Sequence, residues 1–254
     1  MKNKKLEYSA VILLGGKGTR MGFLTKKKPK GLLKIGKYTI LSHLYTQLKL
    51  LKVDEIFLCL GYHHNKIIEY CKKRIVKDSA NILDSLKKKN IKEPNLHFSC
   101  LDKDSSTSER IYKLKKKLNH KNLIILYGDT LLKLNKKKYK SYLMKNLKFD
   151  ILLTLSNPKE KFGIAKIQNK RVISFSEKKV DKRKWVNSGW MVLKKNVLNH
   201  IKNKKSNFES YIFNKVKKFK IIAFKNKSFY LPIDNLKDLQ YANLQWNKNR
   251  KTWY

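Results

Sequence analysis

Few cysteines and no long hydrophobic segments occur in this sequence of 254 residues. Cys59, Cys71 and Cys100 are too few and too widely spaced for a disulfide framework or a zinc site; this favours a reducing compartment, and we expect the cytoplasm. No apolar run approaches the roughly 20 residues that span a bilayer, so no membrane span is expected. The basic start is followed by a short apolar run at 10–14, too short for a secretory signal, which we interpret as part of a first strand.

Acidic residues and arginines are also scarce. The chain has 18 Asp and Glu against 61 Lys and Arg, a net charge of +43, and only six of the basic residues are arginine. A strongly basic chain can bind nucleic acid by releasing counterions. However, proteins that read bases or clamp phosphates favour the bidentate fork of arginine, and here lysines occur in nearly every segment. We therefore interpret the charge as lysine-rich composition on solvated faces and expect no nucleic-acid partner. A basic nucleic-acid-binding protein remains the alternative of a different class.

Hydrophobic residues make up 41% of the chain, enough for a sizeable core, and their spacing predicts an α/β fold in the first half. Buried strands are expected at 9–14, 55–60 and 122–127, with a weaker one at 96–101. Amphipathic helices are expected at 39–51, 65–74 and 108–118. Strands that alternate with helices at this spacing indicate a parallel sheet covered on both faces.

After about residue 150 the pattern changes to strands without full helices between them. The expected strands are 150–155, 163–168, 171–175 and 185–193, and a helix at 236–249 closes the chain. We expect these strands to extend the same sheet in a mixed or antiparallel manner. The prediction is one three-layer, Rossmann-like α/β domain over 1–254 with a mixed central sheet.

A glycine-rich loop directly follows the first expected strand. Residues 13–22 read Leu-Leu-Gly-Gly-Lys-Gly-Thr-Arg-Met-Gly, and such glycines let backbone N–H groups approach phosphate oxygens. The loop is not a P-loop, because Gly-Lys-Ser/Thr after four spacer residues is absent. It also departs from the dinucleotide fingerprint, because Gly22 comes one residue late and no acidic residue ends the second strand. On the glycines alone, an ordinary strand-to-helix turn is an equal alternative.

Two further features give this loop a specific resemblance. Arg20 lies in the loop, and Pro29-Lys30-Gly31 follows about ten residues later. Gly-Gly-x-Gly-Thr-Arg followed by Pro-Lys resembles the signature of the sugar-1-phosphate nucleotidyltransferases, which implies their glycosyltransferase-A-like fold. In that family the arginine holds the β- and γ-phosphates and the lysine contacts the phosphates at the reacting centre, so Arg20 and Lys30 are the expected catalytic residues. The resemblance implies a nucleotide-binding half at 1–150 in which the nucleotide contacts Leu14, Gly15, Gly16, Gly18, Thr19, Arg20, Lys30, Thr107, Arg110 and Gly128.

Two aspartates are candidate metal ligands. Asp129 follows the strand 122–127, at the sheet edge where open α/β sheets bind ligands. Joining two phosphate-bearing substrates brings negative charges together, and a hard cation such as Mg²⁺ offsets that repulsion. A lone aspartate at a strand end is more often a turn former, but the resemblance implies that Asp129 binds the metal. It implies the same of Asp234, for which capping of the last helix is the alternative.

Three short segments match the family's sugar-binding half, 151–254, in order: 162–165, 175–178 and 186–189. Taken singly, Glu177-Lys178 would be a surface charge pair. The resemblance of the ordered set implies that Gly163, Glu177 and Asn187 bind sugar hydroxyls and that Lys178 binds the sugar phosphate. Gly189 is expected in the same sugar-phosphate site.

The end of the chain narrows the resemblance to a subgroup. The segments 228–238 and 244–246, together with Trp253, are similar to the carboxyl end of glucose-1-phosphate cytidylyltransferases. The implied reaction joins CTP and glucose 1-phosphate into a nucleotide sugar for surface glycans and releases pyrophosphate. Thr107-Ser108-Glu109-Arg110 replaces a Thr-Gly-Gly-Arg-like stretch near the base, and Ser188 stands where glycine is usual. A guanylyl- or uridylyltransferase acting on heptose, mannose or glucose phosphate therefore stays open, and so does a homo-oligomeric state.

Overall fold

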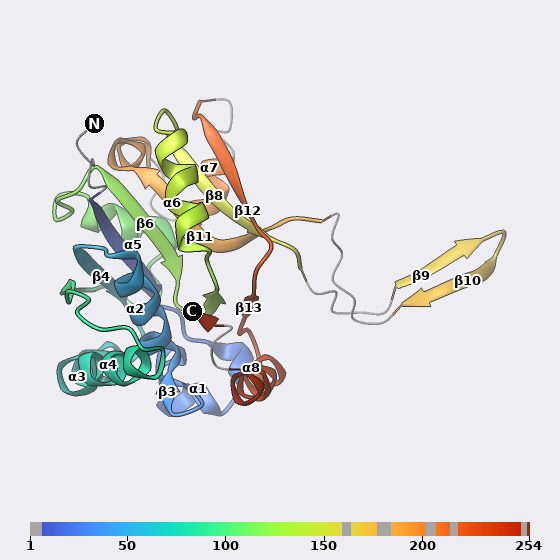
Figure 1. Ribbon diagram of the computed structural model, residues 1–254, viewed down its shortest axis with the longest axis horizontal. Coiled ribbons are helices and arrows are strands. Elements are labelled where there is room, and N and C mark those ends of the chain that lie inside the picture. Colours follow the sequence, from blue (N-terminus) through green and yellow to red (C-terminus); the bar gives the residue numbers. More distant parts are fainter. Residues whose placement is uncertain (1–6, 159–163, 177–183, 202–206, 214–217, 250–252) are drawn as a thin grey trace.

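A mixed sheet of seven strands forms the centre of the computed structural model, which describes residues 7–158, 164–176, 184–201, 207–213, 218–249 and 253–254 (Figure 1). Its strands are β1 (Tyr8–Leu14), β4 (Glu55–Leu60), β5 (Asn95–Cys100), β6 (Asn122–Tyr127), β8 (Ile151–Ser156), β11 (Val186–Lys194) and β12 (Ile221–Asn226). They lie in the order β12-β8-β11-β6-β1-β4-β5. The β6-β1-β4-β5 part is parallel, β11 runs antiparallel to β6 and β8, and β12 is parallel to β8. The predicted α/β class with a mixed central sheet is confirmed.

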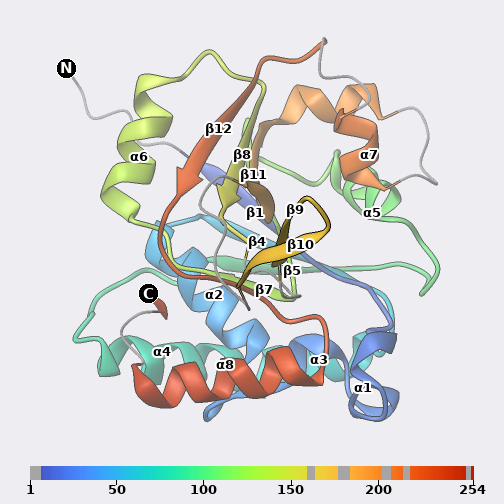
Figure 2. The ribbon, with the colours of Figure 1, turned by 90° about the vertical axis from the view of Figure 1, so that its right-hand side faces the viewer.

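Helices cover both faces of this sheet, because successive strand residues point to opposite sides and are apolar on both. Ile12 and Ile124 belong to one apolar cluster, whereas Val11 and Ile125 belong to the other. The helices that contribute to the first cluster are α2 (Ile40–Leu51), α3 (His64–Tyr70), α6 (Lys136–Lys145) and α8 (Leu236–Lys248). Those that contribute to the second are α5 (Thr107–Leu114) and α7 (Phe208–Phe213). The result is the predicted three-layer arrangement (Figure 2).

The helix expected at 65–74 continues much further. It begins as α3, passes through a π-helical turn at Cys71–Ile75, and continues as α4 (Val76–Ser85), which packs against α2. Ile75, Ile82 and Leu83 are buried along this extension. The basic residues that follow Cys71 face outward, so they do not end the helix.

The second half differs from the prediction in two respects. β9 (Ile164–Gln168) and β10 (Arg171–Ser176) do not extend the central sheet but pair with each other as an antiparallel hairpin, which stands apart from the main sheet in Figure 1. As expected, the described residues between 150 and 194 contain strands and no helix. Helix α6 before this stretch, and α7 and β12 after it, were not predicted. β12 lies at the sheet edge and has mostly partly buried or exposed residues, so its sequence carries a weak strand signal.

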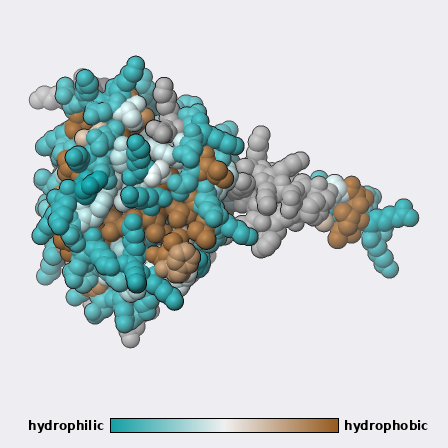
Figure 3. All heavy atoms as spheres, turned by 90° about the horizontal axis from the view of Figure 1, so that it is seen from below, coloured by the Kyte–Doolittle hydropathy of each residue, from teal (hydrophilic) through white to brown (hydrophobic). Residues whose placement is uncertain are grey.

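Short elements connect the layers near the carboxyl ends of the parallel strands. They are α1 (Leu24–Lys27), the small sheets β2 (Lys34–Ile35) with β3 (Tyr38–Thr39) and β7 (Thr130–Leu132) with β13 (Tyr230–Pro232), and 3₁₀ turns at Thr19–Met21 and Lys30–Leu32. Another 3₁₀ turn, Lys195–His200, follows β11 at the opposite edge of the sheet, beside the start of β6. Hydrophilic side chains cover most of the face seen in Figure 3, around an apolar area. Over the described ranges, every helix is too short or too polar to cross a bilayer.

Candidate active site

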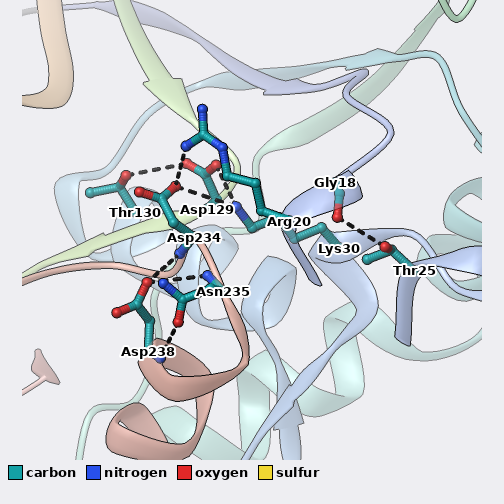
Figure 4. Close-up of polar contacts among 9 residues, drawn as sticks. All are labelled: Gly18, Arg20, Thr25, Lys30, Asp129, Thr130, Asp234, Asn235 and Asp238. Atoms are coloured by element: carbon teal, nitrogen blue, oxygen red, sulfur yellow. Dashed lines mark hydrogen bonds and ion pairs between the residues drawn. The ribbon is translucent and has the colours of Figure 1, made fainter. Parts of the chain in front are cut away.

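The glycine loop leaves the end of β1 and stays open to solvent. Gly16, Thr19 and Arg20 are exposed, and Gly18 adopts a left-handed conformation with a φ of 66°, which favours glycine. The Thr25 hydroxyl donates to the Gly18 carbonyl at 2.9 Å and fixes the turn (Figure 4). The Thr25 hydroxyl therefore holds the loop on its protein side, while the solvent-facing backbone of the loop remains accessible. This arrangement is suited to an anionic ligand.

Leu14 lies beneath this loop and is buried. A Cβ atom added to Gly128 would lie 2.2 Å from Leu14 Cδ2, and one added to Gly31 would lie 2.7 Å from the same atom. Two glycines thus let the loop after β6 and the turn at Lys30–Leu32 close around one leucine side chain. This contact accounts for the glycine at position 31.

Arg110 reaches from α5 under the glycine loop and is only 3% exposed. Its guanidinium donates to the carbonyl oxygens of Leu60 at 2.5 Å, Asp102 at 2.7 Å, Ser105 at 3.2 Å and Lys103 at 3.4 Å. Burial lowers the pKa of Arg110 from its usual value.

The same guanidinium explains why Gly15 and Gly61, which lie against it, are glycines. A Cβ atom added to Gly15 would lie 2.2 Å from Arg110 Cζ, and one added to Gly61 would lie 2.7 Å from Arg110 Nη2. Arg110 thus joins the loop after β1, the end of β4 and the segment before α5. Its predicted contact with a nucleotide stays a prediction, and the geometry favours a supporting role.

Thr107, another predicted nucleotide contact, has a hydrogen bond within the protein. Its hydroxyl accepts a hydrogen bond from the Phe208 amide at 2.9 Å, which attaches α7 to the start of α5. Tyr127, at the end of β6, donates to the Glu209 carboxylate, and burial together with this acid raises the Tyr127 pKa. Neither Tyr127 nor Glu209 was predicted to belong to the site, because α7 gives no local signal of where it packs.

Asp129 and Asp234 are 105 positions apart in the chain but lie side by side. The reason is the antiparallel pairing of β7 with β13, in which Thr130 lies opposite Pro232, and the Ile233 amide donates to the Asp129 carbonyl at 2.9 Å. Asp129 immediately precedes β7 and Asp234 soon follows β13. The two residues are thereby brought together, as the prediction required.

Lys30 lies between the two carboxylates. Its Nζ is 2.8 Å from Asp129 Oδ2 and 3.8 Å from Asp234 Oδ1, and its side chain is 15% exposed (Figure 4). Arg20 approaches the same Asp234 oxygen at 3.9 Å but is 78% exposed. The four predicted residues from three distant segments therefore form one ion cluster, which we call the Lys30 cluster, beside the glycine loop.

Asp234 is not the cap of the last helix. Asn235 caps α8, since its side chain accepts from the Asp238 amide, and the Asp238 carboxylate accepts in return from the Asn235 and Asp234 amides. This capping box, readable as Asn-x-x-Asp in the sequence, leaves the Asp234 side chain available to the Lys30 cluster (Figure 4).

The donor set suits Mg²⁺ only in part. Asp129 and Asp234 are 33% and 30% exposed and already share one cation, the Lys30 ammonium. Within the described ranges, no group of three or more His, Cys, Asp or Glu side chains is placed to hold a metal. Mg²⁺ commonly uses one or two carboxylates and completes its shell with water and substrate phosphates, so the pair fits a metal that arrives with a phosphate ligand.

The expected sugar-phosphate residues are described only in part. Gly163, Glu177 and Lys178 lie outside the described residues. Asn187 Oδ1 accepts from the Gly189 amide at 3.1 Å, where β11 bulges away from β8. Gly189 has a φ of 73°, and a Cβ atom there would lie 3.2 Å from the Tyr127 ring, so this turn packs against the end of β6.

Comparisons with known proteins agree with this geometry. Residues 9–236 match the family described as nucleotidyl transferase. The chain is 30% identical over 251 residues to a Bacillus subtilis protein named "Probable glucose-1-phosphate cytidylyltransferase", covering 96% of this chain and 98% of the relative. It is 26% identical to a D-glycero-alpha-D-manno-heptose 1-phosphate guanylyltransferase of Campylobacter jejuni, covering 88% and 93%. A solved UDP-glucose pyrophosphorylase complexed with UDP-glucose has a TM-score of 0.70, with 96% and 99% of the chains covered; at 13% identity this shows a shared fold.

Proposed function

Because the chain belongs to the nucleotidyl transferase family, we propose that it transfers a nucleotidyl group from a nucleoside triphosphate to a sugar 1-phosphate. CTP and glucose 1-phosphate are the favoured pair, and a nucleotide sugar for surface glycans is the proposed product. The observation that carries this proposal is the Lys30 cluster, in which two carboxylates and two cations meet beside a loop open to phosphate.

The reaction needs positioning and charge neutralisation more than a nucleophile. An oxygen of the sugar phosphate attacks the α-phosphorus, the bond from that phosphorus to the β-phosphate oxygen breaks, and pyrophosphate leaves with the electron pair. A phosphate oxygen is already a competent nucleophile. Arg20 and Lys30 are placed to orient phosphate oxygens and to balance their charge, and Lys178 is proposed to hold the sugar phosphate.

Asp129 and Asp234 are proposed to hold Mg²⁺ together with the phosphates. When bound, the ion would offset the repulsion between the two anionic substrates and the charge on the leaving pyrophosphate. Asp129 immediately precedes β7 and Asp234 follows β13, so the pairing of these two strands holds the two side chains near each other.

The base and the sugar are the finer part of the proposal. The Bacillus subtilis relative supports CTP with glucose 1-phosphate, and the Campylobacter jejuni relative supports a guanylyltransferase acting on a heptose phosphate. Ser108 is fully buried, so its bulk points into the protein rather than toward a ligand. This placement favours keeping the cytidylyl proposal ahead of its alternatives.

The decisive experiment measures pyrophosphate release from each of the four triphosphates with glucose, mannose and heptose 1-phosphates. We expect CTP with glucose 1-phosphate to give the highest kcat/KM. Asp129→Asn should lower the Mg²⁺-dependent rate by about 100-fold or more, as expected for the loss of one electrostatic group at a reacting centre. Asp84→Asn, an exposed position on α4, is the matched control and should keep the wild-type rate.

Two results would overturn the proposal. Near-normal turnover by Asp129→Asn would remove the metal assignment. Absence of pyrophosphate release from every pair, together with tight and steeply salt-dependent binding of DNA or RNA, would favour a nucleic-acid-binding protein instead.

A further inference from the structure

Lys30 is held more firmly than a surface cation. Its ammonium lies 2.8 Å from one carboxylate and 3.8 Å from the other, and its side chain is 15% exposed. Arg20 approaches Asp234 at 3.9 Å and is 78% exposed, so solvent screens its contribution. Lys30 is therefore the principal cation that compensates the two acids in the free protein.

The backbone fixes all three partners in place. Lys30 opens the 3₁₀ turn Lys30–Leu32, and the Leu32 amide donates to the Pro29 carbonyl at 2.9 Å. The carboxylates are anchored by the β7–β13 pair and by the capping box of α8. Two carboxylates held this close repel each other unless a positive charge stands between them.

A divalent cation at the same carboxylates would meet that ammonium. The two cations repel each other, and Mg²⁺ gives up its own water reluctantly. Nucleotide phosphates change this balance, because they offer the three N–H donors of Lys30 another set of acceptors beside the glycine loop. The ammonium can then turn from the carboxylates to the phosphates while all charges stay paired.

We infer that Lys30 serves as the resident cation of the Asp129–Asp234 pair, and that it blocks divalent cations from this pair until a nucleoside triphosphate draws the ammonium away. The inference rests on the proposed function and adds the order of events at the site. By linkage, the metal strengthens nucleotide binding as much as the nucleotide strengthens metal binding.

Mn²⁺ binding to the nucleotide-free protein tests the inference, with free Mn²⁺ measured by electron paramagnetic resonance. Lys30→Met should bind Mn²⁺ at least tenfold more tightly than the wild type, because the competing ammonium is gone. Lys30→Arg keeps the charge and should bind as weakly as the wild type. Lys34→Met removes one positive charge from an exposed position on β2 and should also match the wild type, which controls for net charge.

Adding Asp129→Asn to Lys30→Met should abolish the gain and so locate the tighter binding at the pair. Equal or weaker Mn²⁺ binding by Lys30→Met, when Lys30→Arg is folded and behaves as the wild type, would overturn the inference. That failure differs from failure of the proposed function. An active wild-type enzyme with unchanged Mn²⁺ binding in Lys30→Met refutes only the blocking role, whereas a wild type that releases no pyrophosphate from any pair refutes the function, whatever the Mn²⁺ result.

Discussion

Replacing Arg110 with lysine should damage nucleotide binding through the glycine loop even though the positive charge is kept. The guanidinium donates to four carbonyl oxygens from two segments, the end of β4 and residues 102–105, at 2.5 to 3.4 Å. A lysine has a single nitrogen, so it can satisfy at most part of this set. The loop above and the segment before α5 would then lose their common support.

The magnitude follows from the two shortest bonds. Hydrogen bonds from a charged donor contribute about 1.5–3 kcal/mol each, so loss of two of them should lower the free energy of unfolding by roughly 3–6 kcal/mol. For a chain of this length, each kcal/mol lowers Tm by about 2–4 °C. We expect the KM for the triphosphate to rise about tenfold or more, while the KM for the sugar phosphate changes much less.

Thermal unfolding and steady-state kinetics with each substrate varied in turn would measure both effects. Gly15→Ala should disturb the same contact from the loop, because its methyl group would lie 2.2 Å from Arg110 Cζ. We expect it to raise the KM for the triphosphate as Arg110→Lys does. Lys113→Arg, at an exposed position of α5, is the control. If Arg110→Lys raises both KM values equally, the residue has only a general structural role. An unchanged triphosphate KM would refute the reasoning outright.

Three further predictions concern stability. Gly128→Ala should cost about 1–3 kcal/mol in urea unfolding because its methyl group would overlap Leu14 Cδ2, and Leu14→Ala should relieve part of that cost in the double variant. Burial lowers the pKa of His43 to about 4 from its usual 6.5; the folded state therefore resists protonation, and up to about 3 kcal/mol of stability present above pH 6.5 should be lost as the pH falls toward 4. The urea midpoints measured above pH 6.5 and near pH 4 should differ less in His43→Gln than in the wild type. Asn235→Ala should destabilise α8 by about 1 kcal/mol in the same assay, and a cost near zero would contradict its role as the cap that leaves Asp234 free.

Local spacing explains the features that could be predicted. β1, β4 and β6 each contain five consecutive apolar residues, so their burial on both faces is visible in the sequence. The glycine loop after β1 and the aspartate after β6 follow from those strand ends. The sequence also contains the Asn235 cap, although the alternative that Asp234 caps the helix had to be resolved by the hydrogen bonds of α8.

Other features depend on long-range packing and have no local signal. The hairpin of β9 and β10 has the same alternating pattern as an edge strand of the main sheet, so its separate pairing could not be read from periodicity. The role of Arg110 was equally hidden, because a single arginine near a nucleotide-binding motif does not reveal that its donors are already occupied by carbonyl oxygens.

By itself, the sequence determined the α/β class, the position of the glycine-rich loop and the residue types of the candidate site, because periodicity, glycine content and strand ends are properties of neighbouring residues. Only the tertiary structure decided which charges meet. Asp129 and Asp234 become neighbours through the short β7–β13 pair, and Lys30 enters between them from a third segment. The physical reason is that the interaction of charges depends on their separation in space, which the fold sets and the order of residues along the chain does not.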